Sequence, residues 1–268
     1  MDTSVDNALA EHCDTFQIFT RNPQGWKFNS LDHSEVELFR KKLAESKLGP
    51  VVDHMPYLPN LSTPDNEMYE KSVATLVAEV QRCVELGVPY LVTHLGSHLG
   101  AGRELGLRRL GRALNEAVKY TRGKCMILLE NTAGARNSMG SSFNDIKEIL
   151  NTVKRKRESI GVCLDTCHLY AAGMDLHTDK GVEKTLASFE SAVGFENLKV
   201  VHLNDSRSGL GSGHDRHEHI GMGYIGEKGF RAFLHHPGIK DKPWILETPE
   251  DERRDDIGNI ELVRKLGK

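Results

Sequence analysis

The sequence predicts an α/β protein of the (β/α)8-barrel type, in which parallel strands alternate with helices. Three observations favour this fold. The chain has 268 residues, close to the ~250 that such a barrel usually needs. Short apolar runs of β type alternate with helical patterns, and the ends of these runs recur 34 to 45 residues apart. This repeat is typical of strands joined by helical crossovers, so we expect a single domain over residues 1–268.

Seven apolar runs are predicted to form the strands. Most of them are too continuously apolar for a sheet with one face in water, so we expect helices to cover both faces. A closed barrel of this kind has eight strands, and the chain opens in a helix-like stretch at residues 5–12. We therefore expect a barrel that lacks its first strand at the N-terminus and has a gap there. The runs are TFQIFT (15–20), LGPVVDH (48–54), VPYLVTH (88–94), KCMILLE (124–130), IGVCLD (160–165), LKVVHL (198–203) and PWILE (243–247).

Apolar residues at helical spacing predict the helices between these strands. One such helix begins after Thr63 and Pro64 and ends at Gly87, because a proline near the start and a glycine at the end are typical helix boundaries. Similar apolar stripes run through residues 107–118, 143–153 and 182–193. The run PEDERRDD (249–256) is predicted to be an exposed acidic turn without an assigned function.

Composition excludes several classes of protein. Lys and Arg total 35 against 38 acidic residues, a net charge of −3, so a nucleic-acid partner would have to be met by local positive charge. No apolar run approaches the ~18 residues of a membrane helix, and the polar start is not a signal peptide. We therefore expect no membrane partner. The five cysteines are irregularly spaced, which is typical of reduced thiols in a cytoplasmic protein.

Potential metal ligands end six of the seven predicted strands. In a parallel barrel these ends lie on one face, where the active sites of this fold are found. Two short clusters, DTCHLYAAG and GHDRHEH, add three further ligands at the same face. The candidate set is His54, His94, Glu130, Asp165, His168, His202, Asp215, His217 and Glu247.

These nine residues predict a multimetal site. Nitrogen and oxygen ligands without thiolate suit Zn²⁺, with Mn²⁺ or Fe²⁺ as substitutes. Catalytic zinc takes about three protein ligands, so nine ligands can hold three ions. Three dications (+6) and four carboxylates (−4) leave a net charge of +2, which favours an anionic substrate such as a phosphodiester. Metal clusters also promote phosphoryl displacement. The sequence therefore predicts a metal-dependent phosphoesterase.

The chain resembles the endonuclease IV family of apurinic/apyrimidinic (AP) endonucleases, also called AP endonuclease family 2. The resemblance runs from about residue 2 to 266. The segments that carry it are DHMPYLPNL, HLGSHL, LENTAG, GVCLDTCHLYAAG, HLNDSRSGLGSGHDRHEHIGMGYIG and ILETP. It implies a TIM barrel with three zinc ions per chain. By matching positions, His54, His94 and Glu130 would hold one ion. Glu130 would bridge to a second ion, completed by Asp165, His202 and Glu247. His168, Asp215 and His217 would hold the third.

The same resemblance implies the reaction. The family hydrolyses the phosphodiester 5′ to abasic sites in duplex DNA, leaves 3′-hydroxyl and 5′-deoxyribose phosphate ends, and trims blocked 3′ ends in base excision repair. Glu130, as the bridging ligand, is the candidate catalytic residue. Tyr57 matches the family's wedge tyrosine, and Asn22 and Trp26 match a DNA-binding segment. Gln24 stands where related enzymes often carry an intercalating arginine. We expect a monomer that acts on abasic duplex DNA.

Two alternatives remain open. A metal-dependent sugar isomerase or epimerase of the same barrel type also places acids and histidines at strand ends, but it usually needs only one or two ions. A non-catalytic protein would bind abasic DNA without nicking it. The number of metal ions per chain separates the first alternative from the nuclease, and an incision assay separates the second.

Overall fold

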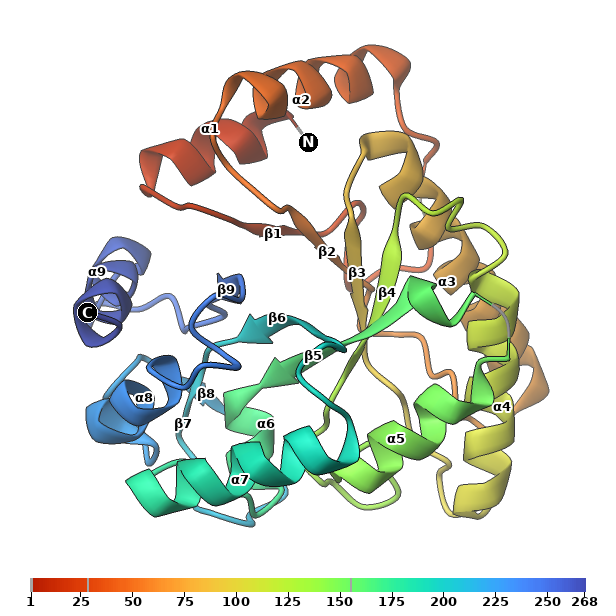
Figure 1. The fold of residues 1–268 in the computed structure, drawn as a ribbon. Coiled ribbons are helices and arrows are strands. Elements are labelled where there is room, and N and C mark those ends of the chain that lie inside the picture. Colours follow the sequence, from red (N-terminus) through yellow and green to blue (C-terminus); the bar gives the residue numbers. More distant parts are fainter. Residues whose placement is uncertain (1, 28, 155) are drawn as a thin grey trace. The chain divides into compact units, whose positions relative to one another are not determined.

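The computed structural model describes residues 2–27, 29–154 and 156–268, and they form two compact units. Unit 1 comprises residues 1–129 and 149–161, and unit 2 comprises residues 130–148 and 162–268. Strands and helices alternate in both units, and Figure 1 shows this order along the chain. Among the described residues, no helix has both the length and the apolar character of a membrane span.

Unit 1 contains a run of short parallel strands that pair in chain order. β1 (Gln17–Ile18) pairs with β2 (Val52–His54), which pairs with β3 (Tyr90–Thr93). β3 in turn pairs with β4 (Met126–Glu130), whose last residue belongs to unit 2. The apolar residues of these strands are almost completely buried, which explains their continuous apolar character in the sequence.

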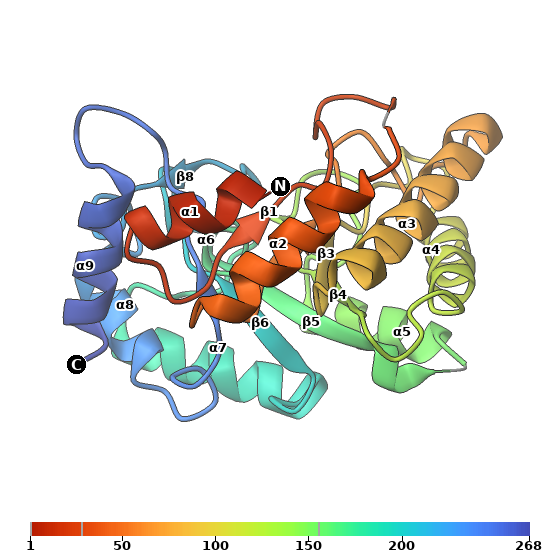
Figure 2. The same cartoon turned by 90° about the horizontal axis from the view of Figure 1, so that it is seen from above.

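The helices of unit 1 are α1 (Asp2–Ala10), α2 (His33–Glu45), α3 (Asn66–Leu86) and α4 (Arg103–Ala117), with the end of α5 (Phe143–Thr152) and the short 3-10 helix η1 (Arg157–Ser159). Figure 2 shows α1 and α2 side by side, and the two helices are in contact. The carboxylate of Asp65 caps α3 by accepting a hydrogen bond from the Met68 amide at 2.7 Å. Gly87 ends α3 in the left-handed conformation, with φ of 77°.

The next three strands of the sheet also pair in parallel, and they lie mostly in unit 2. β5 (Ile160–Asp165) pairs with β6 (Leu198–His202), and β6 pairs with β9 (Trp244–Ile245). The described residues thus include seven parallel strands, each within a predicted run. This number confirms the prediction of one strand fewer than eight.

The other elements of unit 2 are helices and one small hairpin. The helices are α6 (Thr166–Ala171), α7 (Asp179–Ala192), α8 (Gly226–Leu234) and α9 (Asp256–Leu266). β7 (Asp205–Ser206) and β8 (His217–Glu218) pair antiparallel. The predicted helices at 143–153 and 182–193 correspond to α5 and α7. That residues 1–268 act as one domain stays a prediction.

Candidate metal centre

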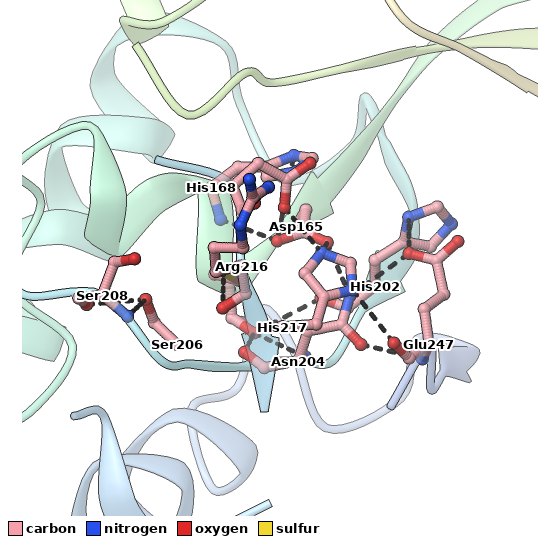
Figure 3. Close-up of polar contacts among 12 residues, drawn as sticks. Asp165, His168, His202, Asn204, Ser206, Ser208, Arg216, His217 and Glu247 are labelled. Atoms are coloured by element: carbon pink, nitrogen blue, oxygen red, sulfur yellow. Dashed lines mark hydrogen bonds and ion pairs between the residues drawn. The ribbon is translucent and has the colours of Figure 1, made fainter. Parts of the chain in front are cut away.

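The strand ends of unit 2 bring carboxylates and a histidine together. Glu130, Asp165 and His202 are the last residues of β4, β5 and β6, and Glu247 lies two residues beyond β9. Because parallel strands end at the same edge of a sheet, their last side chains converge. Nδ1 of His202 lies 3.0 Å from Oε1 of Glu130 and 3.1 Å from Oε2 of Glu247. These four residues each offer a ligand atom within 4.8 Å of the others, and Figure 3 shows His202 between Asp165 and Glu247.

A second group lies beside the first. Asp165 caps the short helix α6, since its Oδ1 accepts a hydrogen bond from the amide of His168 at 2.7 Å. This turn brings His168 next to the strand ends, where its Nε2 lies 3.0 Å from Oδ2 of Asp215. Nε2 of His217, on β8, lies 3.1 Å from the other oxygen of Asp215 and 3.6 Å from Oδ2 of Asp165. Ligand atoms of His168, Asp215 and His217 again fall within 4.8 Å of one another.

Backbone carbonyls hold the histidine rings in one orientation. Nδ1 of His168 donates to the carbonyl of Asn131 at 2.9 Å, and Nδ1 of His217 donates to the carbonyl of Glu247 at 3.0 Å. A carbonyl oxygen can only accept, so Nδ1 carries the proton in both rings. Nε2 is then the ring atom that faces the carboxylates, where it can hold either a second proton or a metal ion. Metal-binding histidines are typically held in this way.

Two asparagines that the sequence did not single out hold Asp165 and Glu247 in place. Asn204 donates from Nδ2 to Oδ2 of Asp165 at 2.6 Å and to Oε2 of Glu247 at 3.2 Å. Asn131 accepts from the Asp165 amide at 2.8 Å and donates to the Asp165 carbonyl at 3.1 Å. Both asparagines are buried. Their position one or two residues after a strand-end ligand was the available signal, in the motifs LEN and HLN.

Asp205 is another buried residue that supports the centre. Its carboxylate accepts hydrogen bonds from the backbone amides of Gly221, Gly223 and Ile225 at 2.9 to 3.0 Å, and so it holds the loop that follows β8. Gly223 is required by this packing, because a Cβ atom there would lie 2.4 Å from the carbonyl oxygen of Ser206. The loop therefore forms a compact support next to the strand of His217.

Burial and neighbouring charges shift the pKa values of the histidines and carboxylates in opposite directions. Burial alone would lower the pKa of His168, but the carboxylates of Asp165, Asp215 and Glu130 raise it to about 10. Burial opposes protonation of His217 as well, yet Asp215 and Asp165 raise its pKa to about 9. Conversely, burial favours the neutral form of Asp215, but hydrogen bonds with His168 and His217 outweigh this effect and lower its pKa. The carboxylates thus attract positive charge to the ligand atoms of both rings, and a divalent cation can replace the two protons.

This donor set fits divalent metal ions. Carboxylate oxygens and imidazole nitrogens converge, and each imidazole already has its other nitrogen hydrogen bonded. Cys167 also lies close to Asp165 and His217. Burial raises the pKa of its thiol to about 12, so Cys167 remains protonated and is a poor ligand.

The remaining predicted site residues lie in unit 1. His54 is the last residue of β2, Tyr57 lies three residues further on, His94 follows β3, and Asn22 and Trp26 lie in the segment after β1. His54 and His94 have ring centroids 5.0 Å apart, and Nδ1 of His54 donates to the carbonyl of Met55 at 2.7 Å. Tyr57 is 54% exposed, and its ring lies 6.0 Å from that of His54 and 6.2 Å from that of His94.

Asn22 and Trp26 occupy the segment that follows β1. The side chain of Asn22 accepts a hydrogen bond from the Gln24 amide at 2.9 Å and so shapes the turn. Trp26 is half-buried, with the ammonium of Lys71 4.3 Å above its ring. Unit 1 therefore brings together the two predicted histidine ligands and the predicted wedge tyrosine, while unit 2 brings together the other seven ligands.

Known proteins resemble this chain over nearly its whole length. Residues 5–265 match the family model described as "Xylose isomerase-like TIM barrel". A relative from Methanoculleus marisnigri, named "Probable endonuclease 4", is 53% identical over 99% of this chain and 94% of its own length. The crystal structure of endonuclease IV from Thermus thermophilus matches with a TM-score of 0.88 and 37% identity, over 99% of this chain and 93% of that one.

A more distant match shows the fold alone. The crystal structure of a D-tagatose 3-epimerase-like protein matches with a TM-score of 0.75 over 99% of this chain and 92% of that one, but the two sequences are only 18% identical. The predicted TIM-barrel fold is therefore confirmed, and the higher sequence identity is with the endonuclease 4 relative.

Proposed function

This chain belongs to the endonuclease IV family of xylose isomerase-like TIM barrels, and we propose that it is a DNA-repair endonuclease specific for abasic sites. In this proposal it hydrolyses the phosphodiester 5′ to an abasic site in duplex DNA and leaves 3′-hydroxyl and 5′-deoxyribose phosphate ends. It also trims blocked 3′ ends. The high identity and nearly complete coverage of the relatives support the assignment to this family's chemistry.

One observation carries the proposal. Four carboxylates and three histidines of unit 2 converge with their ligand atoms facing one another. In His168 and His217 the other ring nitrogen, Nδ1, is already hydrogen bonded to a backbone carbonyl. Carboxylates this close together repel each other unless positive charge lies between them, most strongly where they are buried, as Glu130 and Asp165 are. We propose that this charge is supplied by zinc, three ions per chain, with manganese or iron as substitutes.

The ligand assignment follows the family resemblance. His168, Asp215 and His217 would hold one ion, and Glu130, Asp165, His202 and Glu247 would surround a second. The distances within unit 2 support both groups. The third ion, held by His54, His94 and Glu130, rests on the resemblance.

The residues of the chain have separate tasks in this proposal. When bound, the ions would supply the Lewis acidity and the water activation that phosphodiester hydrolysis needs. Glu130 would fix the spacing of two ions, and its burial keeps competing water away. Asn131 and Asn204 hold the carboxylate of Asp165 and the neighbouring backbone in place, so that the site needs little rearrangement as charge develops.

DNA binding is proposed for three residues of unit 1. An abasic nucleotide has to leave the helix to reach a buried centre, and enzymes that extrude nucleotides often insert side chains into the gap. The exposed ring of Tyr57 suits such a wedge. Asn22 and Trp26 would contact the DNA backbone, while Gln24 would fill the gap less strongly than the arginine of related enzymes.

We also propose that the protein works as a monomer in the cytoplasm. None of the five cysteines, all of which lie within the described residues, forms a disulfide, and four of them are buried. Cysteines without disulfides suit a reducing compartment.

The test compares the wild-type protein with Glu130→Gln on a duplex that contains a reduced abasic site, without added Mg²⁺. We expect the wild type to nick on the 5′ side of the lesion. Glu130→Gln should lose about 10²–10³-fold in rate, because the neutral amide cannot bridge two ions. Glu116→Gln, at a half-buried glutamate on α4 that pairs with Lys119, serves as the control. Tight retention of uncut DNA by the wild type would favour the binding protein. A measured content of only one or two ions per chain would favour the isomerase or epimerase.

A further inference from the structure

The acidic run at residues 249–256 is not only an exposed turn. It begins two residues after the predicted ligand Glu247, and it contains Arg253, which contacts the residue next to another predicted ligand. Glu218 follows His217 on β8, and successive side chains of a strand point to opposite sides. His217 faces the metal centre, so Glu218 faces away from it. Its side chain is only 7% exposed, and a buried carboxylate needs strong partners.

Arg253 supplies these partners in a two-pronged contact. Its Nη2 lies 2.8 Å from Oε1 of Glu218, and its Nη1 donates to Oε2 at 3.0 Å. Arg207 adds a third contact from Nε to Oε2 at 3.2 Å. Isolated surface ion pairs contribute little to stability, but an arginine with two contacts to a buried carboxylate fixes the relative position of the two side chains much more strongly. Glu218 and Arg253 therefore fix the β7–β8 hairpin to the segment after Glu247.

The same arginine also connects, through Asp251, to His219, the residue that follows β8. Nη2 of Arg253 lies 2.7 Å from Oδ2 of Asp251, and Oδ1 of Asp251 lies 3.0 Å from Nε2 of His219. His219 is fully buried, and its Nδ1 accepts from the side chain of Asn259 on α9 at 2.9 Å. We call Glu218, Arg253, Asp251 and His219 the Arg253 clamp.

The segments that the clamp joins have little regular structure of their own. β7 and β8 have two residues each, and no strand or helix is assigned between Ile245 and Asp256 apart from an isolated bridge between Asp251 and Arg254. Yet the carbonyl of Glu247 has to meet Nδ1 of His217 at 3.0 Å. Metal ligands have to be held to within a few tenths of an ångström, and two-residue strands cannot do this alone.

We propose that Arg253 is a positioning residue for the metal centre, which holds His217 and Glu247 in their places through the Arg253 clamp. The inference rests on the proposed metal centre, but not on which substrate the enzyme cleaves. Loss of Arg253 would let the hairpin and the segment of Glu247 shift against each other. The ions that these residues hold would then bind less tightly.

The experiment measures zinc affinity and melting temperature for Arg253→Ala, Arg253→Lys and a control. Arg231→Ala, an exposed position on α8, removes the same side chain away from the clamp. Zinc is titrated against a competing chelator. We expect Arg253→Ala to bind at least one zinc ion about 10–100-fold less tightly, as when a group that orients a metal ligand is lost. Arg253→Lys should recover part of the affinity, since it keeps the charge but not the two-pronged contact.

The readouts separate positioning from general stability. A positioning role reduces the rise in melting temperature that zinc causes, whereas a merely structural role lowers the melting temperature equally with and without zinc. Zinc affinity equal to that of Arg231→Ala would overturn the proposal. If Arg253→Ala does not fold, Asp251→Asn removes half of the clamp and should weaken zinc binding in the same direction. A wild type that binds zinc but does not nick abasic DNA would overturn the proposed function and leave the clamp intact.

Discussion

Two buried charged clusters, one in each unit, balance their charges in different ways. In unit 1, Glu79 on α3 is fully buried and lies 2.6 Å from Nε of Arg21, and Arg82 is buried beside it. Arg82 donates to the hydroxyl of Thr20 at 2.8 Å and to the carbonyl of Asn29 at 2.9 Å. The guanidinium groups are permanent cations. This cluster therefore carries its own positive charge.

In unit 2 the carboxylates of the metal centre contact histidines instead. A histidine ring is positive only while both of its nitrogens are protonated, so the charge balance of this cluster depends on pH or on an added cation. The difference teaches how to recognise a metal centre among buried charges. A cluster with guanidinium groups contains its own permanent positive charge, whereas a cluster of carboxylates and imidazoles depends on bound protons or on a metal ion.

The largest effect expected from this difference concerns metal removal. Dialysis of the protein against a strong chelator should abolish nicking of abasic DNA, because the histidine–carboxylate cluster then holds protons only. Added zinc should restore activity. The assay is gel analysis of a labelled duplex before and after dialysis. Undiminished nicking by a protein shown by elemental analysis to contain no metal would contradict the proposed centre.

The second prediction concerns the cluster of unit 1. Arg21→Ala should lower the free energy of unfolding by about 3–5 kcal/mol, because it removes the ion-pair partner of the buried carboxylate of Glu79. Zinc should not offset this loss. Urea denaturation with and without zinc measures it, and Arg108→Ala, whose ion pair with Glu104 is exposed, is the control. A loss no larger than that of the control would mean that Arg21 is not required to balance the cluster.

The smallest effect concerns pH in the metal-free protein. The pKa values of His168 and His217 are raised to about 10 and about 9, above the ~6.5 of an unfolded histidine. A group with a raised pKa contributes stability that is complete below the unfolded pKa and is lost as pH rises through the folded value. The melting temperature of metal-free protein should therefore fall between about pH 6.5 and pH 10.

Zinc should remove this dependence and release protons as it binds, about two at pH 7. Calorimetric titration in two buffers with different ionisation enthalpies measures the release. His177→Gln, which changes a histidine on the loop before α7, is the control. Zinc binding without proton release would show that His168 and His217 do not hold the metal.

Much of the fold was predictable from the sequence because burial on both faces leaves a continuous apolar run. IGVCLD became β5 over Ile160–Asp165 without a change of bounds. The β7–β8 hairpin was missed because its strands consist of Asp205 and Ser206, and of His217 and Glu218, with no apolar alternation. Tertiary contacts, not local preference, make these residues a hairpin.

The ligands were predictable for a related reason, since each stands at a strand end or in a short dense cluster. The residues that hold them were harder to find. Asn204 contacts Asp165 and Glu247, which lie 39 and 43 residues away in the chain. The buried face of α3 also contains Glu79 and Arg82, which an apolar stripe of valines and leucines does not predict. The spacing of residues along the chain does not predict which charged side chains pair across the fold.

The backbone carbonyls behind the histidine rings have one more consequence. Met55, Asn131 and Glu247 select the tautomer of His54, His168 and His217 before any ion arrives. Exchange of one transition metal for another then requires no imidazole to flip. In the proposed centre, the ligand atoms would therefore face zinc, manganese or iron in the same way.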